Sequence, residues 1–281
     1  MLNIGVIPFA TSQTMPIVEF GQQVEALGFE SLFLPDHPVL PAQFESPFPG
    51  GGELPDEYRR MLDPLTALAA VAGATETIKL GTAITLILER PPLISAVQFA
   101  TLDQISRGRL IIGAGSGWLK EEGDIFGVDW ERRGTQMKDY FRAMKRCWQD
   151  PVAAYQGSHV SFPELICEPK PLQKPNPPIL IAGEMKFAAR RAAIYGDGWI
   201  PRYLWVTPED IAVGKARMVT AYKEYGRDPS TIDITLFGCR QNKQEMARYE
   251  QAGVTRILFL LKAEPAEMMR ERLNRLAERV L

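Results

Sequence analysis

The chain contains two histidines, His37 and His159, and His37 follows Asp36 at the end of the apolar stretch SLFLP. An imidazole titrates near neutral pH, so it can donate a hydrogen bond or a proton to a cofactor ring or a substrate anion. We predict His37 as the catalytic residue, because the carboxyl ends of strands carry the chemistry in α/β barrels. The alternatives are a structural role for His37 and capping of the following loop by Asp36.

A second segment suited to ligand binding is FATLDQISRGRLIIGAGSGW, residues 99–118. A helical pattern and an Arg-Gly-Arg turn precede residues 110–112, which form a continuous apolar run typical of a parallel strand. We interpret the glycines at 113, 115 and 117 as a loop whose backbone approaches a flat or phosphorylated ligand, with a purely structural turn as the alternative. Trp118 stands where a dinucleotide-binding fingerprint needs its third glycine, which disfavours that fold.

Strand signals alternate with helix signals along the whole chain, which favours a mainly parallel sheet with helical crossovers. Asp63-Pro64 and Thr207-Pro208 each place a capping side chain before a proline suited to a first helical turn. Eight such units predict a (β/α)₈ TIM barrel with its chemistry at the carboxyl ends of the strands, although an open doubly wound sheet has the same signals. The predicted strands span residues 2–8, 31–35, 79–85, 109–113, 178–183, 198–201, 232–238 and 255–261.

Two connections are too long for simple loops of an α/β unit. Residues 38–62 follow a strand end and carry Phe44, Phe48 and Tyr58, so we expect this segment to lie over the active face. A mobile surface loop is the alternative. Residues 151–177 carry a predicted hairpin, AAYQGSHVSF, and a proline-rich return.

The composition predicts one soluble domain over residues 1–281. With 46% hydrophobic and 23% charged residues, the chain can bury a large core. A net charge of -2 without a basic block argues against nucleic acid as a partner. Cys147, Cys167 and Cys239 are isolated, which indicates neither a disulfide framework nor a zinc site. Since no basic leader and no membrane-length apolar run occur, we expect a cytoplasmic protein without a membrane partner.

Several blocks taken together resemble the bacterial luciferase-like oxidoreductase superfamily. They are GFESLFLPDH, KLGTAIT, residues 99–118, FGVDWERRG, EPKPLQKPNPPILIAGE and ARRAAIYGDGWIP, in an order and spacing that extend over nearly the whole chain. The resemblance implies a (β/α)₈ barrel with insertions after strand 2 and before strand 5. It also implies FMN or the deazaflavin coenzyme F420 as cofactor, and the pattern ATLDQISRGRLIIGAGSGWLKEE with ERRG is most similar to the F420 branch. Relatives often dimerise, so a homodimer is expected.

The resemblance implies where the cofactor ring would lie. Asp36 would contact the hydroxyl-bearing edge of the deazaflavin, and a bulge in the third strand would press a cis peptide, Ala83–Ile84, against the middle of the ring. The phosphate end would lie near Gly183, before a helix that we expect to begin near Phe187, because helix starts attract anions. Arg190 or Arg191 would add positive charge there. The full set of predicted cofactor-binding residues is Asp36, Ala83, Ile84, Thr85, Gly115, Ser116, Gly183 and Glu184.

The chain also departs from its apparent relatives. Many carry a basic residue, His and Pro after the third strand, whereas this chain has Arg90-Pro91-Pro92. In relatives that oxidise glucose 6-phosphate, an acidic proton acceptor stands at the position of Trp118, so sugar-phosphate oxidation is disfavoured. We predict a substrate pocket of Trp118, Phe44 and Phe48 for a nonpolar or planar small molecule.

Three functions remain open from the sequence. The leading hypothesis is hydride exchange between coenzyme F420 and a small organic substrate, with His37 as proton donor. The second is an FMN-dependent monooxygenase that receives reduced FMN from a partner reductase. The third is a protein that binds a flavin or deazaflavin without turnover. A metal-dependent hydrolase is disfavoured, because two distant histidines do not form a metal cluster.

Overall fold

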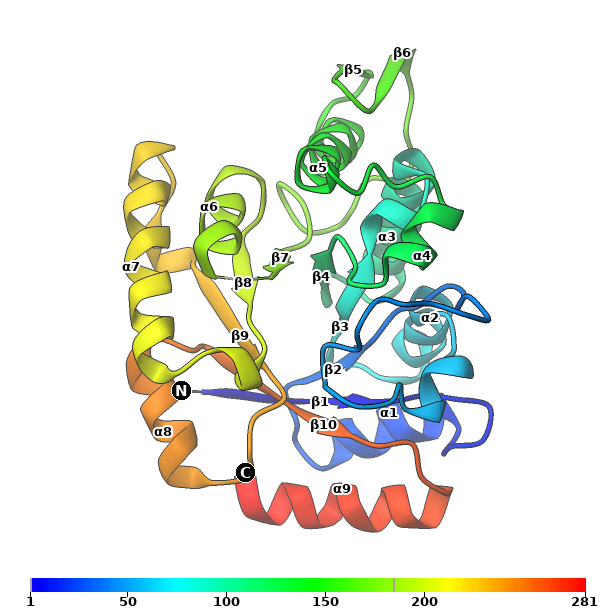
Figure 1. The fold of residues 1–281 in the computed structure, drawn as a ribbon, viewed down its shortest axis with the longest axis vertical. Helices are drawn as coiled ribbons and strands as arrows, with labels where there is room; N and C mark the ends of the chain where they lie inside the picture. The colour runs from blue at the N-terminus through cyan, green and yellow to red at the C-terminus, as the bar shows by residue number, and fades with distance from the viewer. Residues whose placement is uncertain (1, 184) are drawn as a thin grey trace.

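Eight parallel strands form a closed barrel in the computed structural model, which describes residues 2–183 and 185–281. The strands follow one another around the ring in chain order, and β1 closes it by pairing with β10 from the other end of the chain (Figure 1). All eight predicted strands are present, so the (β/α)₈ barrel is confirmed and the open doubly wound sheet is wrong. The barrel strands are β1 (Asn3–Pro8), β2 (Ser31–Leu34), β3 (Lys79–Leu86), β4 (Leu110–Gly115), β7 (Ile179–Ala182), β8 (Gly198–Ile200), β9 (Asp233–Phe237) and β10 (Arg256–Leu261).

Helices cover the outside of the barrel (Figure 1). Both predicted helix starts are confirmed: the Asp63 side chain accepts a hydrogen bond from the Thr66 N–H before α2, and Thr207 forms a capping box with Asp210 before α7. The helix after β7 begins at Met185, slightly earlier than predicted. The α-helices are α1 (Ile17–Ala26), α2 (Pro64–Ala74), α3 (Pro92–Ile105), α4 (Lys120–Ile125), α5 (Arg133–Gln149), α6 (Met185–Tyr195), α7 (Pro208–Glu224), α8 (Lys243–Ala252) and α9 (Ala266–Val280).

Two long segments interrupt the alternation of strand and helix. Residues 35–63 join β2 to α2 and contain the short 3₁₀ helix η1 (Asp56–Arg59). The predicted hairpin is also present, since β5 (Ala153–Gln156) and β6 (Ser161–Leu165) pair antiparallel beyond α5, at the top of Figure 1. Short 3₁₀ helices follow β3, β8 and α7, namely η2 (Ile87–Glu89), η3 (Tyr203–Trp205) and η4 (Pro229–Thr231).

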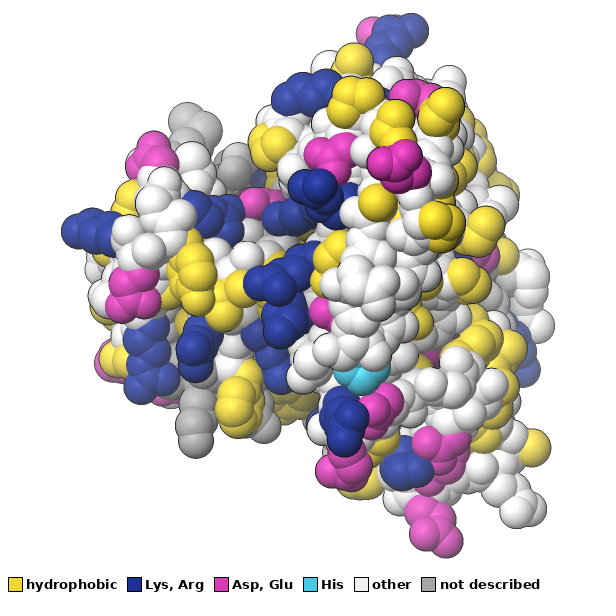
Figure 2. Space-filling model, turned by 90° about the horizontal axis from the view of Figure 1, so that it is seen from above, with side chains coloured by type: hydrophobic (Ala, Val, Ile, Leu, Met, Phe, Trp, Pro, Cys, Tyr) yellow, Lys and Arg dark blue, Asp and Glu magenta, His cyan; other side chains and the backbone are white. Residues whose placement is uncertain are grey.

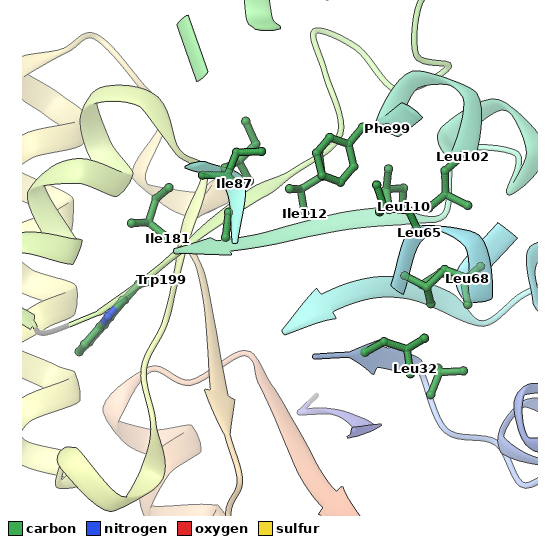
Figure 3. Packing of buried hydrophobic residues seen from close by; sticks show 14 of the residues in the cluster. Leu32, Leu65, Leu68, Ile87, Phe99, Leu102, Leu110, Ile112, Ile181 and Trp199 are labelled. Carbon is green, nitrogen blue, oxygen red and sulfur yellow. The ribbon is translucent and has the colours of Figure 1, made fainter. Parts of the chain in front are cut away.

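Apolar side chains fill two layers, as expected for strands covered on both faces. The larger layer lies between strands and helices, where Leu32, Leu68, Phe99 and Ile112 are fully or almost fully buried (Figure 3). The second layer fills the inside of the barrel, so the barrel is a packed core rather than a pore. Its buried members are Ile7, Phe33, Ala83, Ile111, Leu180, Ile200 and Leu258.

The strand β4 extends through Gly115, so the interpretation of Gly113 and Gly115 as loop residues is wrong. Because these two glycines have no side chain, the neighbouring strand β3 can approach β4 closely. A Cβ on Gly113 would lie 2.1 Å from the Thr82 carbonyl oxygen, and one on Gly115 would lie 2.3 Å from Cδ1 of Ile84. At this place the register between β3 and β4 shifts, and the predicted cis peptide Ala83–Ile84 is confirmed.

Ion pairs close the amino-terminal end of the barrel. Arg256 donates from Nε to Glu30 at 2.8 Å and from a terminal nitrogen to Asp233 at 2.7 Å, and its side chain is 3% exposed. These bonds outweigh the effect of burial and raise the pKa of Arg256. The opposite end, where the strands terminate, is therefore the end available for chemistry. Among the described residues, no helix has both the length and the apolar character needed to cross a membrane.

Candidate active site

The carboxyl ends of the barrel strands surround a partly apolar floor. Ile84, Ala182 and Phe237 are partly buried and pack on the interior layer of the barrel, so they form its boundary with the exterior. The strands β2 and β4 both pair with β3, and therefore residues that follow them lie on either side of the Ala83–Ile84 peptide. Figure 2 shows that one face of the molecule is hollowed between the side of α6 and α7 and the side of α5, with Lys and Arg side chains gathered along the hollow.

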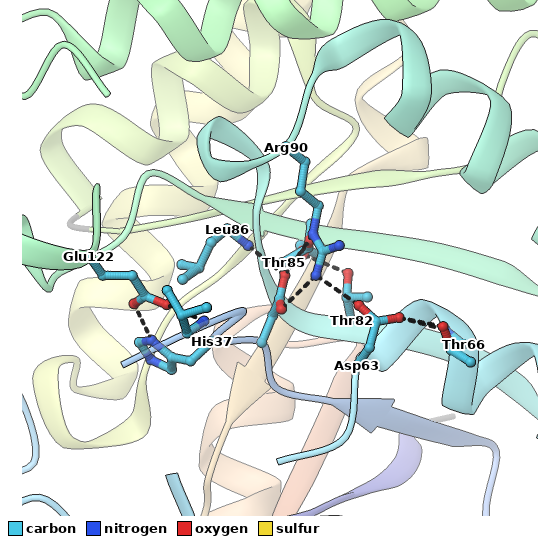
Figure 4. Close-up of polar contacts among 11 residues, drawn as sticks. His37, Asp63, Thr66, Thr82, Thr85, Leu86, Arg90 and Glu122 are labelled. Atoms are coloured by element: carbon cyan, nitrogen blue, oxygen red, sulfur yellow. Dashed lines mark hydrogen bonds and ion pairs between the residues drawn. The ribbon is translucent and has the colours of Figure 1, made fainter. Parts of the chain in front are cut away.

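His37 is held by two hydrogen bonds at this end of the barrel, and Figure 4 shows the one that joins it to Glu122. Nε1 of Trp118 donates to Nε2 of His37 at 3.2 Å, and Nδ1 of His37 lies 2.5 Å from a carboxylate oxygen of Glu122. An acceptor at Nε2 carries no proton, so this network assigns the ring proton to Nδ1, which donates it to Glu122. The side chains of His37 and Glu122 are 6% and 0% exposed. His37 therefore has a fixed tautomer and orientation, with a lone pair on Nε2.

Aromatic rings enclose His37, and they include all three residues predicted for the substrate pocket. The ring centroids of His37 and Trp118 are 5.7 Å apart, and Phe48 and Phe44 lie 5.8 Å and 6.4 Å from Trp118. Tyr58 lies 5.4 Å from both His37 and Phe48. Residues 38–62 thus bring their aromatic side chains to the strand ends, as expected.

Hydrogen bonds to the first turn of α4 fix this segment. One oxygen of Glu121 accepts from the backbone N–H groups of Glu45 and Ser46 at 2.8 Å and 3.1 Å, and Glu122 accepts from the N–H of Val39. Hydrogen bonds from Ser46 and from the Glu45 backbone lower the pKa of Glu121 to about 2. Residues 38–62 are therefore an attached part of the site, and the alternative of a mobile surface loop is not favoured.

Asp36 braces the end of β3. Its side chain is 1% exposed and accepts hydrogen bonds from the Thr85 hydroxyl, the Leu86 N–H and both Nε and a terminal nitrogen of Arg90 (Figure 4). Arg90 also donates to Asp63 at 3.0 Å. The carboxylates of Asp36 and Asp63 outweigh burial and raise the pKa of Arg90. The structure thus gives Asp36 and Thr85 partners within the protein, and their predicted contact with a cofactor remains a prediction.

Glu89 is a buried carboxyl group next to these residues. Its residue exposure is 6%, and its Oε2 has no hydrogen-bond partner among the described residues. Burial, together with the negative charges of Glu122 and Asp36, raises the pKa of Glu89 to about 9. Glu89 is therefore protonated at neutral pH and adds no second negative charge beside the Glu122–His37 pair.

We expect Glu89→Gln to stabilise the protein increasingly as the pH rises from 5 to 9. The pKa of Glu89 is about 9 in the folded chain and 4.5 in the reference state, so in this range the unfolded chain binds fewer protons than the folded chain. The stability of the wild type then falls with pH, and the variant lacks this loss. The difference in unfolding free energy should grow by up to about 1.4 kcal/mol per pH unit.

Urea denaturation at pH 5, 7 and 9 measures this difference, with Glu53→Gln, at an exposed position, as the control. A difference for Glu89→Gln that stays constant with pH would show that Glu89 is ionised in the folded chain.

The remaining predicted residues lie around the same strand ends. Ser116 follows β4 directly and is half-buried, and Gly183 follows β7 with a φ of 119°. The Gly183 carbonyl accepts a hydrogen bond from Nε1 of Trp199 at 3.0 Å. Glu184, also predicted to bind the cofactor, lies outside the described residues.

Sequence reasoning missed Glu122, Glu89 and Arg202 as members of the site. The sequence contains a feature that could have indicated Glu122 as a site residue, because it is one of two adjacent acidic residues in a short helix that follows a barrel strand. Arg202 follows β8, and its guanidinium lies over the rings of Trp205 and Phe237. Tyr58 was noted only as part of the long segment, although it contacts His37 directly.

Known proteins share both the sequence pattern and the fold. Residues 8–279 match the family model described as luciferase-like monooxygenase. An uncharacterized protein of Mycobacterium tuberculosis is 30% identical over 289 residues, which cover 99% of each chain. An FMNH(2)-dependent dimethylsulfone monooxygenase of Pseudomonas putida is 32% identical over 140 residues, covering 48% of this chain and 38% of that protein. A solved F420-dependent secondary alcohol dehydrogenase, in complex with an F420-acetone adduct, superimposes with a TM-score of 0.77 at 17% identity, covering 100% of this chain and 99% of that chain.

Proposed function

Because the chain belongs to the luciferase-like monooxygenase family, we propose that it is an oxidoreductase that binds coenzyme F420 and exchanges a hydride with a small organic alcohol or carbonyl compound. The observation that carries this proposal is the His37 imidazole, fixed by Glu122 and Trp118 at the same strand ends as the Ala83–Ile84 bulge of β3. Such a group handles a proton during hydride transfer. The fold shared with an F420-dependent secondary alcohol dehydrogenase adds support for this cofactor.

The residues at the strand ends fit a flat ring. Ala83, Gly115 and Ala182 are small, and Ile84 lies over Gly115 because no Cβ occupies that space. A planar ring can therefore rest on Ile84 and the neighbouring backbone. In the proposed complex Ala83, Ile84, Gly115 and Ser116 hold the ring, and Gly183 lies toward the phosphate end. Bound F420 would supply a ring carbon that accepts or donates the hydride.

His37 would handle the proton. A substrate hydroxyl that displaces the Trp118 N–H can hydrogen-bond to Nε2 of His37 and transfer its proton there as the hydride leaves the adjacent carbon. Glu122 then stabilises the resulting imidazolium through Nδ1. In carbonyl reduction the same imidazolium returns the proton to the oxygen, which agrees with the role of donor expected from the sequence. Trp118, Phe44, Phe48 and Tyr58 exclude water from this reaction and contact the apolar part of the substrate.

Titration of the purified protein with F420 and with FMN, followed by cofactor fluorescence, tests the proposal. We expect saturable F420 binding, followed by F420 reduction when a panel of primary and secondary alcohols is added. Tight FMN binding without F420 binding would reject the proposal and favour the FMN-dependent monooxygenase with its partner reductase. Tight F420 binding without turnover on any alcohol or carbonyl compound would favour the non-catalytic binding protein.

We expect Gly115→Ala to weaken both the binding of the cofactor and the fold. The new Cβ would lie 2.3 Å from Cδ1 of Ile84, so the end of that side chain must turn toward the ring. The unfolding free energy should fall by about 1 to 3 kcal/mol, whereas the dissociation constant of F420 should rise roughly tenfold, the effect of a small steric change in a pocket.

The matched control is Gly73→Ala in α2, where a Cβ meets nothing within 4 Å. It should leave F420 affinity unchanged and stabilise the chain by about 0.4 to 1 kcal/mol. Unchanged F420 affinity in Gly115→Ala would place the ring elsewhere.

A further inference from the structure

A guanidinium that pairs with no carboxylate among the described residues lies at the same end of the barrel. Arg202 follows β8 and is half-buried, yet its side chain makes no hydrogen bond or ion pair within the described residues. Burial lowers the pKa of Arg202, which is the expected effect when no carboxylate compensates the desolvation. A guanidinium carries five N–H donors, and removing them from water without acceptors is unfavourable.

The backbone and two rings hold Arg202 in place. Its backbone forms a parallel bridge with Phe237, and the Phe237 N–H donates to the Pro201 carbonyl at 2.9 Å. The guanidinium carbon lies 4.7 Å from the Trp205 ring centroid and 5.6 Å from that of Phe237. Because Phe237 belongs to the apolar floor, Arg202 lies over that floor. The rings contact the face of the guanidinium and leave its N–H edge available.

Other buried or half-buried arginines of this fold have acceptors for their N–H groups within the protein. Arg90, Arg227 and Arg256 pair with carboxylates, and Arg109 donates to backbone carbonyls and to the Thr75 hydroxyl. Arg202 differs from them, although it is partly withdrawn from solvent. A structural role in bracing the barrel therefore does not account for its N–H groups.

Tyr58 connects Arg202 to the aromatic residues around His37. Burial raises the pKa of the Tyr58 phenol, and the positive charge of the nearby Arg202 opposes part of this effect. The Tyr58 hydroxyl has no hydrogen-bond partner among the residues that the structure describes, while its ring lies 5.4 Å from His37. Two donor groups without a hydrogen-bond partner in the described part of the chain, the Arg202 guanidinium and the Tyr58 hydroxyl, thus border the pocket that holds the proposed proton carrier.

We propose that Arg202, with the hydroxyl of Tyr58, binds the carboxylate of the substrate, so that the substrate is an organic acid with an apolar or planar body. The fork of a guanidinium matches the two oxygens of a carboxylate, and the aromatic rings of Phe48, Tyr58 and Trp118 match the body. The identification of this ligand as the substrate rests on the proposed function. The subsite itself depends only on the groups described above.

Isothermal titration calorimetry of the purified protein, with and without F420, tests the subsite. The probes are benzoate and its neutral counterpart benzamide. Wild-type protein should bind benzoate roughly tenfold to a hundredfold more tightly than benzamide, the range for a charge-assisted hydrogen-bonded pair. Arg202→Gln should abolish this preference without changing benzamide affinity, and Arg202→Lys should retain part of it. Arg217→Gln, at an exposed position on α7, should behave as wild type.

Two results would overturn the subsite. One is equal benzoate affinity in wild type and Arg202→Gln. The other is a loss of F420 or FMN affinity in Arg202→Gln with benzoate binding intact, which would assign the guanidinium to the cofactor. The calorimetric readout needs no turnover, so the subsite and the proposed function can fail separately. If the wild-type protein does not bind F420, the proposed function is rejected. If Arg202→Gln still abolishes the preference for benzoate in that case, the subsite is retained.

Discussion

His37→Ala should lower the turnover number by about 10²- to 10⁴-fold and leave the dissociation constant of F420 within a few-fold of wild type. The imidazole accepts or returns one proton in the proposed reaction, and alanine offers no replacement. The cofactor ring rests mainly on Ile84 and the adjacent backbone, which the substitution leaves in place. The measurement is the initial rate of F420 reduction with the most active alcohol of the panel, together with a fluorescence titration of F420.

The control for His37 is Trp118→Phe, which keeps an aromatic ring and removes the N–H that donates to Nε2. It should lower the turnover number much less than His37→Ala, because Nε2 and its Glu122 partner remain. Equal losses of turnover and cofactor affinity in His37→Ala would mean that the imidazole supports the pocket and takes no part in proton transfer.

Asp36→Ala should lower the unfolding free energy by about 3 to 5 kcal/mol, the cost of removing one partner of a buried ion pair. The substitution deprives the Thr85 hydroxyl and the Leu86 N–H of their acceptor and leaves Arg90, 15% exposed, with Asp63 alone. Chemical denaturation in urea at neutral pH measures the loss.

The matched comparison is Asp63→Ala, which removes the more exposed partner of Arg90 and the cap of α2. Its cost should be about 1 kcal/mol, typical of a lost helix cap. If Asp36→Ala were as stable as wild type but failed to bind F420, Asp36 would be a cofactor ligand, as the resemblance implies, and its bracing of β3 would carry little energy.

The barrel was predictable because its signals are local. Apolar runs bounded by turn residues mark each strand, and the Asp63-Pro64 and Thr207-Pro208 pairs mark helix starts. The end of β4 was not predictable in the same way. Glycine after an apolar run indicates a loop, but Gly113 and Gly115 stay in the strand because the Thr82 carbonyl and the Ile84 side chain of β3 occupy the space of their missing Cβ atoms.

The site was predictable only in part, since its contacts join distant segments. Position at a strand end and the family pattern suffice to single out His37, and the aromatic residues of the long segment suggest a pocket. The Glu122 carboxylate lies 85 positions further along the chain than His37, and nothing in the intervening sequence indicates that they meet. The sequence likewise does not show that Arg202 has no carboxylate partner among residues 2–183 and 185–281, because this depends on which residues surround it in the fold.

A crystal structure of the protein with F420 bound tests the central claim most directly, namely that a redox ring lies at the strand ends beside His37. We expect the ring to lie against the Ala83–Ile84 peptide, with its reactive carbon facing the space between His37 and Trp118. A ring bound away from β3, or a His37 side chain turned away from the ring, would contradict this account.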